Sequence, residues 1–289
     1  VAMESMHEAI SIANLPEWGL KIGTAAKSLT LLRDQLFVAQ GQLNNELTAV
    51  GDIQRSMLPK ALPDIPGFDV ASHYHPCALA GGDYFDIVPL AGGMWGLIIA
   101  DVAGHGVSAT VIMAVMRSLV HAHLPLTTQY MSSNRFLEFM NRQMCGPYTT
   151  GGRFVTVWCA VLDPVARELT YASAGHNPPR LVRQGSVLAL DEARSLPLGI
   201  DEFATYEEVT VSLESGDLLL AYTDGFTEAV RGDEGHREYF GTERLDQVLL
   251  ESPPGCAQDC VRRVTEAVMD FSETHVPADD QTLLVVAVD

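Results

Sequence analysis

The sequence is short of positive charge. Its 289 residues include 18 Lys and Arg against 37 Asp and Glu, which gives a formal net charge of −19. A surface of this sign repels the phosphates of nucleic acids and the headgroups of anionic membranes, so we exclude both as partners. The excess of carboxylates suits the binding of cations, although a solvated acidic surface explains the same count.

Cysteine motifs and long apolar runs are also missing. The five cysteines are scattered, and no CxxC or Cys/His pattern typical of a zinc site occurs. Reduced thiols in a cytoplasmic protein are therefore expected. No apolar run reaches the roughly 18 to 20 residues that cross a bilayer, and no signal peptide is recognised. The remaining composition, 47% hydrophobic and 19% charged, is that of a folded globular protein.

A heptad pattern covers residues 29–57. Apolar residues recur every seven positions, and a second seam with one polar member follows three positions after each of the first four; the two seams are Leu29, Leu36, Leu43, Val50 and Met57, and Leu32, Ala39, Glu46 and Ile53. This alternation predicts a coiled coil, through which we expect a homodimer. A single amphipathic helix lying on the domain is the alternative. Residues 1–57 are assigned to an N-terminal helical segment for dimerisation and signalling.

Prolines separate this segment from the rest of the chain. Pro59, Pro63 and Pro66 cannot continue an α-helix, so residues 58–67 are predicted to be a linker. From 68 to 289 the chain contains many apolar runs of strand length, such as FDVASHYH, FVTVWCAVL and TLLVVAV. Helical patterns are fewer, at 106–123, 133–145 and 255–275. This mixture predicts an α+β domain with packed sheets rather than strict βαβ alternation.

Carboxylates recur where the predicted strands begin or end. Asp83 follows two glycines before an apolar run, Asp101 and Asp224 follow apolar strands, and Asp279 with Asp280 precedes the last strand. Asp is common in turns, so each position alone is unremarkable. If the strand ends converge, however, the like charges need a compensating cation. A ligand set of oxygen atoms selects Mg²⁺ or Mn²⁺ rather than zinc, and two such ions could act on a phosphoryl group.

The motifs together resemble a known family. GGDYFDI, IADVAGHGVSAT, SAGHNPP, LPLGI, LLAYTDGFTEA and DDQTLLVV occur in this order between residues 81 and 286. The series resembles the SpoIIE-type bacterial branch of the metal-dependent protein serine/threonine phosphatases (PPM, or type 2C-like, superfamily). The resemblance implies a four-layer α/β/β/α sandwich with two Mn²⁺ or Mg²⁺ ions. It also implies hydrolysis of phosphoserine or phosphothreonine on a regulatory protein, of the anti-sigma-factor antagonist type.

The resemblance also assigns roles to individual residues. Asp83, Asp101, Asp224 and Asp279 match the metal ligands, with Asp101 as the bridging group and the backbone carbonyl of Val102 as a further ligand. A water held by the two ions would then attack phosphorus in line, without a phospho-enzyme. Supporting positions are Gly82, Gly104, His105, Glu228 and Asp280.

One position departs from the pattern of eukaryotic relatives. There, Gly-His follows the bridging Asp directly, whereas here His105 lies four positions after Asp101. We therefore do not assign His105 the role of proton donor, and a capping or packing role explains it equally well. The SAGHNPP segment, with Gly175, His176 and Asn177, is interpreted as a tight turn between strands.

Regulation and the alternative functions follow from the same features. The N-terminal helix, entering through the proline linker, is expected to transmit a signal that moves the 106–123 helix behind Asp101. One alternative is a dimeric signalling module with a degenerate site. The other is a GHKL-type ATP-binding kinase, because DVAGHG resembles a turn of that family, but the spacing differs by one residue.

Overall fold

We analysed a computed structural model of the chain. It describes residues 15–104, 106–123, 132–149, 151–232, 235–252, 255–274 and 276–289. The chain divides into two compact units, Val1–Ala49 and Val50–Asp289, which are described separately. Among the described helices, none combines the length and the apolar composition that crossing a membrane requires.

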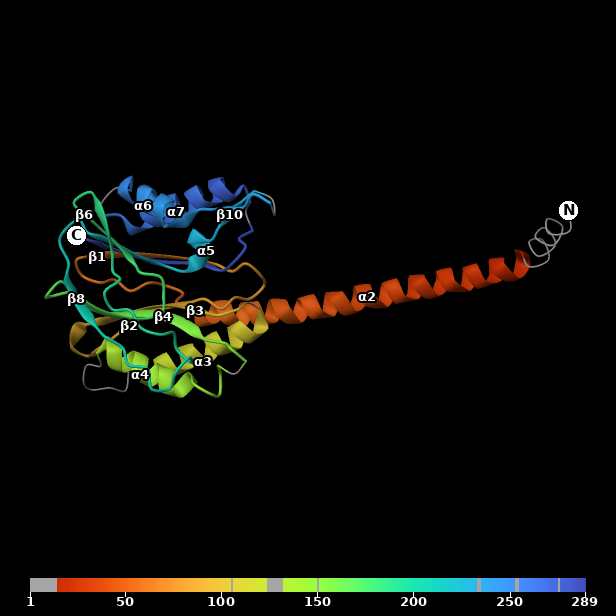
Figure 1. Ribbon diagram of the computed structural model, residues 1–289, viewed down its shortest axis with the longest axis horizontal. Coiled ribbons are helices and arrows are strands. Elements are labelled where there is room, and N and C mark those ends of the chain that lie inside the picture. The colour runs from red at the N-terminus through yellow and green to blue at the C-terminus, as the bar shows by residue number, and fades with distance from the viewer. Residues whose placement is uncertain are drawn as a thin grey trace. The chain divides into compact units, whose positions relative to one another are not determined.

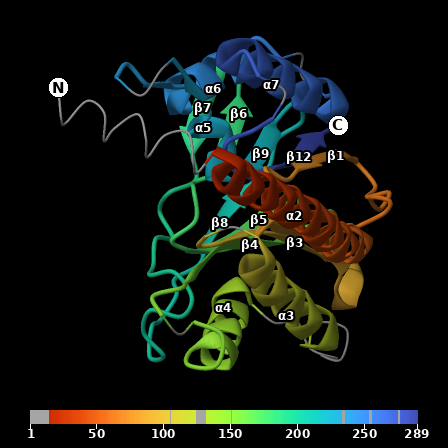
Figure 2. The ribbon, with the colours of Figure 1, turned by 90° about the vertical axis from the view of Figure 1, so that its right-hand side faces the viewer.

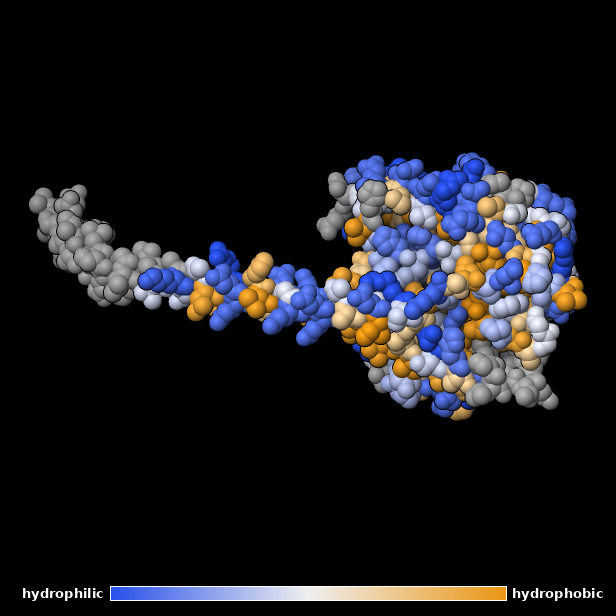
Figure 3. Space-filling model, turned by 180° about the vertical axis from the view of Figure 1, so that it is seen from behind, coloured by the Kyte–Doolittle hydropathy of each residue, from blue (hydrophilic) through white to orange (hydrophobic). Residues whose placement is uncertain are grey.

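A long helix, α2 (Leu15–Met57), makes up the described part of the first unit, and its residues 50–57 belong to the second. The heptad side chains of the first unit lie at the surface of the single chain: Leu29, Leu32, Leu36 and Leu43 are 54% to 69% exposed. Figure 3 shows such apolar side chains between hydrophilic ones along this helix. The long helix is therefore observed, and the dimeric coiled coil stays a prediction.

Two five-stranded antiparallel sheets form the centre of the second unit (Figures 1 and 2). In the first sheet the order is β1 (Phe68–His75), β12 (Gln281–Val288), β9 (Leu218–Tyr222), β6 (Arg180–Arg183) and β7 (Ser186–Ala189). In the second sheet it is β2 (Tyr84–Pro89), β3 (Trp95–Val102), β4 (Val155–Asp163), β5 (Glu168–Ala174) and β8 (Val209–Ser212). A small ribbon pairs β10 (Val230–Arg231) with β11 (Glu238–Tyr239).

Helices cover the outer face of each sheet. In Figure 1, α3 (Val107–His123) and α4 (Ser133–Met144) lie on the second sheet, and α6 (Gly241–Leu250) and α7 (Ala257–Ser272) lie on the first. A short helix, α5 (Asp224–Thr227), follows β9, and a 3₁₀ turn, η1 (Ala91–Gly93), joins β2 to β3. The predicted four-layer α/β/β/α sandwich is confirmed.

Strand β12 shows why the sandwich forms. Its even-numbered residues Leu284 and Val286 belong to the core between the sheets, while Leu283 and Val285 pack in the core beneath α6 and α7. Successive side chains of a strand point to opposite faces, so a continuous apolar run is buried on both sides. Each such side chain stabilises the fold by about 1.5–3 kcal/mol. The proline-rich segment 58–67 also packs on this unit, through the buried Leu58 and Ile65.

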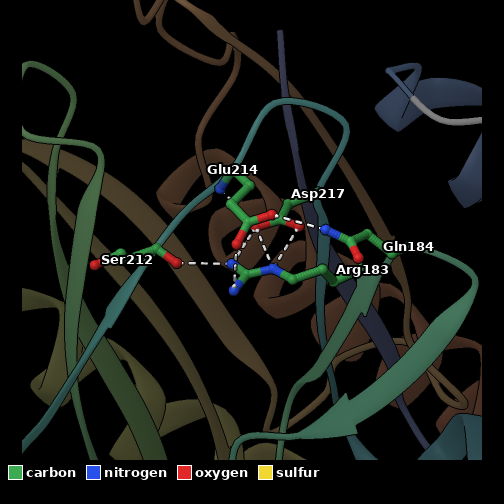
Figure 4. A network of polar contacts seen from close by, with 5 residues as sticks. All are labelled: Arg183, Gln184, Ser212, Glu214 and Asp217. Atoms are coloured by element: carbon green, nitrogen blue, oxygen red, sulfur yellow. Dashed lines mark hydrogen bonds and ion pairs between the residues drawn. The ribbon is translucent and has the colours of Figure 1, made fainter.

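A charged network holds the start of β9, the end opposite Asp224. The Arg183 guanidinium contacts the buried Asp217 carboxylate with Nε–Oδ1 and Nη2–Oδ2 distances of 2.9 and 2.5 Å, and it donates to the Ser212 carbonyl at 2.7 Å. Figure 4 shows these contacts together with Glu214 and Gln184. Because the buried carboxylate is paired with a fork of donors, we interpret this network as a structural anchor between the β6–β7 and β8–β9 turns.

Candidate metal centre

The carboxylates predicted from the sequence come from both sheets. Asp83 immediately precedes β2 and Asp101 is the penultimate residue of β3, and their neighbours Tyr84 and Ala100 pair across these strands. Asp224 follows β9 at the start of α5, and Asp279 lies just before β12. Since β9 and β12 are also antiparallel neighbours, the end of one lies beside the beginning of the other. The topology therefore places all four residues at one end of the sandwich.

Asp83 ties the two sheets together. It is 1% exposed, and its Oδ2 accepts hydrogen bonds from the Thr223 hydroxyl at 2.7 Å and the Thr282 hydroxyl at 2.5 Å. Thr223 follows β9 and Thr282 lies in β12, so both threonines belong to the first sheet. Asp83 precedes β2 of the second sheet. The two hydroxyl donors fix Oδ2 of Asp83. Its Oδ1 accepts no hydrogen bond from the described residues and is therefore free to act as a ligand.

The carboxylates of the site act on one another's pKa values. Burial and the nearby Asp224 and Asp279 raise the pKa of Asp101 to about 7, with further contributions from Asp280 and Glu228. Burial, Glu228 and Asp279 raise that of Asp224 to about 6. The pKa of Asp83 is also well above its ordinary value, because of burial and the charges of Asp101 and Asp280.

Acidic side chains, rather than basic ones, are the largest charge influences on these three pKa values. Negative charge therefore dominates the surroundings of these carboxylates. Like charges in a partly buried cluster favour protonation unless a positive ion is bound. The arrangement therefore has the electrostatic character of a cation site.

The donor set fits a hard divalent ion. Cys77 has its sulfur within 4.8 Å of carboxylate oxygens of Asp279 and Asp280, which raises the question of a soft metal. Burial, followed by the charge of Asp280, raises the pKa of the Cys77 thiol to about 12. The four ligands predicted from the sequence are carboxylates, so their donors are oxygens. Oxygen donors suit Mg²⁺ or Mn²⁺.

Asp280 holds the loop in front of Asp83. Its Oδ1 accepts from the Cys77 backbone N–H at 2.8 Å and its Oδ2 from the Gly82 N–H at 2.6 Å. A Cβ on Gly81 would lie 2.2 Å from Asp280 Oδ2, so only glycine fits at that position. Both oxygens of Asp280 are thus engaged with backbone amides, which favours the predicted supporting role over that of a ligand.

The other predicted residues differ in their placement. Val102 is buried, and a Cβ on Gly82 would lie 3.0 Å from its carbonyl oxygen, so the two backbones approach closely here. Gly104 is exposed with a φ of +97°, a conformation that favours glycine. Glu228 is exposed, and its charge acts on Asp101 and Asp224. His105 lies outside the described residues.

Several residues that support the site were not singled out in the sequence. Thr223 lies in the YTDG motif and Thr282 in the DDQT motif. A hydroxyl so near a predicted ligand in the sequence was the one feature that could have indicated their role. Gln54, on α2, makes two hydrogen bonds to the backbone of Gly81. Its Nε2 donates to the Gly81 carbonyl at 2.7 Å, and its Oε1 accepts from the Gly81 N–H at 2.9 Å. Nothing in the sequence distinguishes Gln54 from other polar residues of that helix.

Helix α3 contacts the same loop and the end of α2. The Thr110 hydroxyl donates to the Gly81 carbonyl at 3.0 Å, and the Arg117 guanidinium donates to the carbonyl of Met57, the last residue of α2. A Cβ on Gly51 would lie 1.9 Å from the Leu79 carbonyl oxygen, so the end of α2 approaches this loop at backbone distance. The loop that carries Asp83 is therefore held by two helices.

Comparison with known proteins agrees with this description. Phosphoserine phosphatase RsbU of Bacillus subtilis is 27% identical over 86% of the chain and 71% of its own length. Protein IcfG of Synechocystis is 25% identical over 92% of the chain, which spans less than half (46%) of IcfG. Among solved structures, the SiaA-PP2C domain of Pseudomonas aeruginosa superposes with a TM-score of 0.74 at 20% identity, covering 87% of this chain and 99% of that one.

A second solved structure is closer in sequence. The RsbU and RsbW domains of Rv1364c from Mycobacterium tuberculosis match with a TM-score of 0.66 at 26% identity, over 80% of this chain and 63% of that one. The family model described as Stage II sporulation protein E (SpoIIE) matches residues 91–289. The chain therefore belongs to the SpoIIE family of PP2C-type protein serine/threonine phosphatases.

Proposed function

We propose that this phosphatase acts through two Mn²⁺ or Mg²⁺ ions on a phosphoserine or phosphothreonine of a regulatory protein, of the anti-sigma-factor antagonist type. The observation that supports it is that Asp83, Asp101, Asp224 and Asp279 lie at one end of the sandwich, where acidic side chains are the largest charge influences on the first three. The similarity to RsbU, a phosphoserine phosphatase, supports phosphoserine as the target. The antagonist class rests on the family resemblance alone.

The four aspartates and the Val102 carbonyl would hold the ions. When bound, a pair of such ions lowers the pKa of water and stabilises the charge on a transferring phosphoryl group. The residues of the chain prepare this site: Thr223 and Thr282 fix one oxygen of Asp83, and Asp280 fixes the loop before it. Without the ions, the carboxylates repel a phosphate dianion, so substrate binding itself is expected to require metal.

Hydrolysis of p-nitrophenyl phosphate in Mn²⁺, in Mg²⁺ and in EDTA tests this proposal. We expect turnover with Mn²⁺ or Mg²⁺ and none in EDTA, because the carboxylates alone supply no positive charge to the phosphoryl group. Turnover that continues in EDTA would refute the metal mechanism. If no metal gives turnover, calorimetric titration with Mn²⁺ distinguishes an inactive conformation, which still binds the ion, from a degenerate site, which does not.

Regulation of the phosphatase is proposed to pass through the end of α2. The amide of Gln54 makes two hydrogen bonds to Gly81, whose neighbour Gly82 is held by Asp280 and precedes Asp83. A rotation of this helix would therefore displace the backbone before a proposed ligand. The heptad seam at 29–57 would join two chains and couple their helices, which predicts a homodimer mass in light scattering.

Replacing Gln54 by Ala is expected to lower Mn²⁺ affinity and kcat by about 10-fold, because the loss of both hydrogen bonds leaves the Gly81 amide and carbonyl poorly satisfied. Calorimetry with Mn²⁺ and p-nitrophenyl phosphate kinetics measure the two effects. Gln42→Ala, at an exposed position of the same helix, is the matched control and should behave as wild type. If the two variants have the same Mn²⁺ affinity and kcat, the end of α2 does not influence the metal site.

A further inference from the structure

His176 lies in a turn beside β4 of the second sheet. It follows β5 at the end of the second sheet and is 7% exposed. Its turn is rigid: Gly175 has a φ of +68°, a Cβ there would lie 2.6 Å from Pro197 Cγ, and Gly175 bridges to Val157 of β4. The surrounding backbone therefore holds the imidazole in place.

One nitrogen faces the strand beside Asp101. His176 Nδ1 lies 2.8 Å from the Thr156 hydroxyl, and Thr156 is the residue of β4 that pairs with Asp101 of β3. Directly opposed residues of antiparallel strands have their Cβ atoms about 4.5–5.5 Å apart. His176 is thus hydrogen-bonded to the residue that lies directly opposite Asp101, the predicted bridging ligand.

The other nitrogen of the ring is buried. Burial lowers the pKa of His176 to about 4, so the ring is neutral at physiological pH. Nε2 makes no hydrogen bond with the described residues. Among these residues, the hydrogen bond of Nδ1 to Thr156 is therefore the polar contact that holds the ring.

We propose that His176 is a positioning residue that fixes Thr156, and through it the strand of Asp101, by its hydrogen bond to the Thr156 hydroxyl. The repulsion between the site carboxylates tends to separate them, and a metal centre requires its ligands at fixed distances. A neutral ring fills this position without adding charge. The inference rests on the proposed metal centre.

The test compares Thr156→Val, Thr156→Ser and His176→Gln with wild type. Val is close to Thr in shape but lacks the hydroxyl, whereas Ser retains it. We expect Thr156→Val and His176→Gln to weaken Mn²⁺ binding in calorimetry by about 10- to 100-fold, as for other residues that orient metal ligands. Thr156→Ser should remain within about threefold of wild type. At saturating Mn²⁺, the KM for p-nitrophenyl phosphate should not change, because neither residue contacts substrate.

A control separates positioning from general packing. His123 of α3 also has a buried Nε2 without a partner among the described residues, and it stacks on Phe139 away from the carboxylates. His123→Gln should change the melting temperature without changing Mn²⁺ affinity. Wild-type affinity in Thr156→Val overturns the positioning role, even if His176→Gln fails to fold. A wild-type protein that binds no Mn²⁺ overturns the proposed metal centre itself.

Discussion

Asp101→Asn is expected to lower kcat for p-nitrophenyl phosphate by about 10³-fold or more while the protein remains folded. Four acidic residues of the site, Asp224, Asp279, Asp280 and Glu228, act on Asp101. It is therefore the carboxylate best placed to contact both proposed ions. An amide of the same shape preserves packing but removes the negative charge and one anionic ligand atom, so both metal affinity and turnover should fall.

Circular dichroism and Mn²⁺ calorimetry must accompany this assay, because only a folded variant that fails to bind metal supports the assignment. Asp270→Asn, at an exposed position of α7, is the matched control, and we expect wild-type activity from it. If Asp101→Asn turns over substrate at a rate within tenfold of wild type, Asp101 is not the bridging ligand and the proposed mechanism fails.

The placement of the site could be predicted because local patterns determine where strands begin and end. The runs that end at Asp101 and Asp224 are apolar on both faces, as strands of a covered sheet must be, and each carboxylate marks the end of its apolar run. Antiparallel pairing brings the end of one strand beside the beginning of its neighbour, and this was enough to expect the carboxylates near one another. The strands β6 and β7 were not predicted, because each has only four residues and a partly exposed, mixed composition.

The supporting contacts could not be predicted because they join distant residues. Thr282 and Asp83 are 199 positions apart, and Gln54 and Gly81 are 27 apart on different elements. A hydroxyl or an amide has no periodic signal of its own, and its partner is decided only by packing of the two sheets and the helices. His176 shows the same limit: its motif predicted a turn, whereas its hydrogen bond with Thr156 depends on how the turn after β5 lies beside β4.

The metal-free protein is expected to lose stability as pH rises from 5 to 8. The pKa of Asp101 is about 7 and that of Asp224 about 6 in the folded chain, both above their ordinary value of 3.8. A raised folded-state pKa means that the folded protein holds these protons more tightly than the unfolded chain does. Their stabilising effect is therefore complete at low pH and is lost as pH passes through 6 and 7. One pKa unit corresponds to about 1.4 kcal/mol, so we expect a decrease of roughly 2 kcal/mol or more in the free energy of unfolding.

Thermal melts in EDTA between pH 5 and 8, repeated with Mn²⁺, measure this effect. Manganese should raise the melting temperature most at pH 8, because it binds the ionised carboxylates of the folded protein. Asp101→Asn isolates the site from the general effect of net charge: in EDTA it should be more stable than wild type at pH 8, with a flatter pH dependence, and it should lose most of the response to Mn²⁺. A wild-type melting temperature that stays constant or rises across this range in EDTA would mean that these carboxylates are compensated without metal, which contradicts the proposed centre.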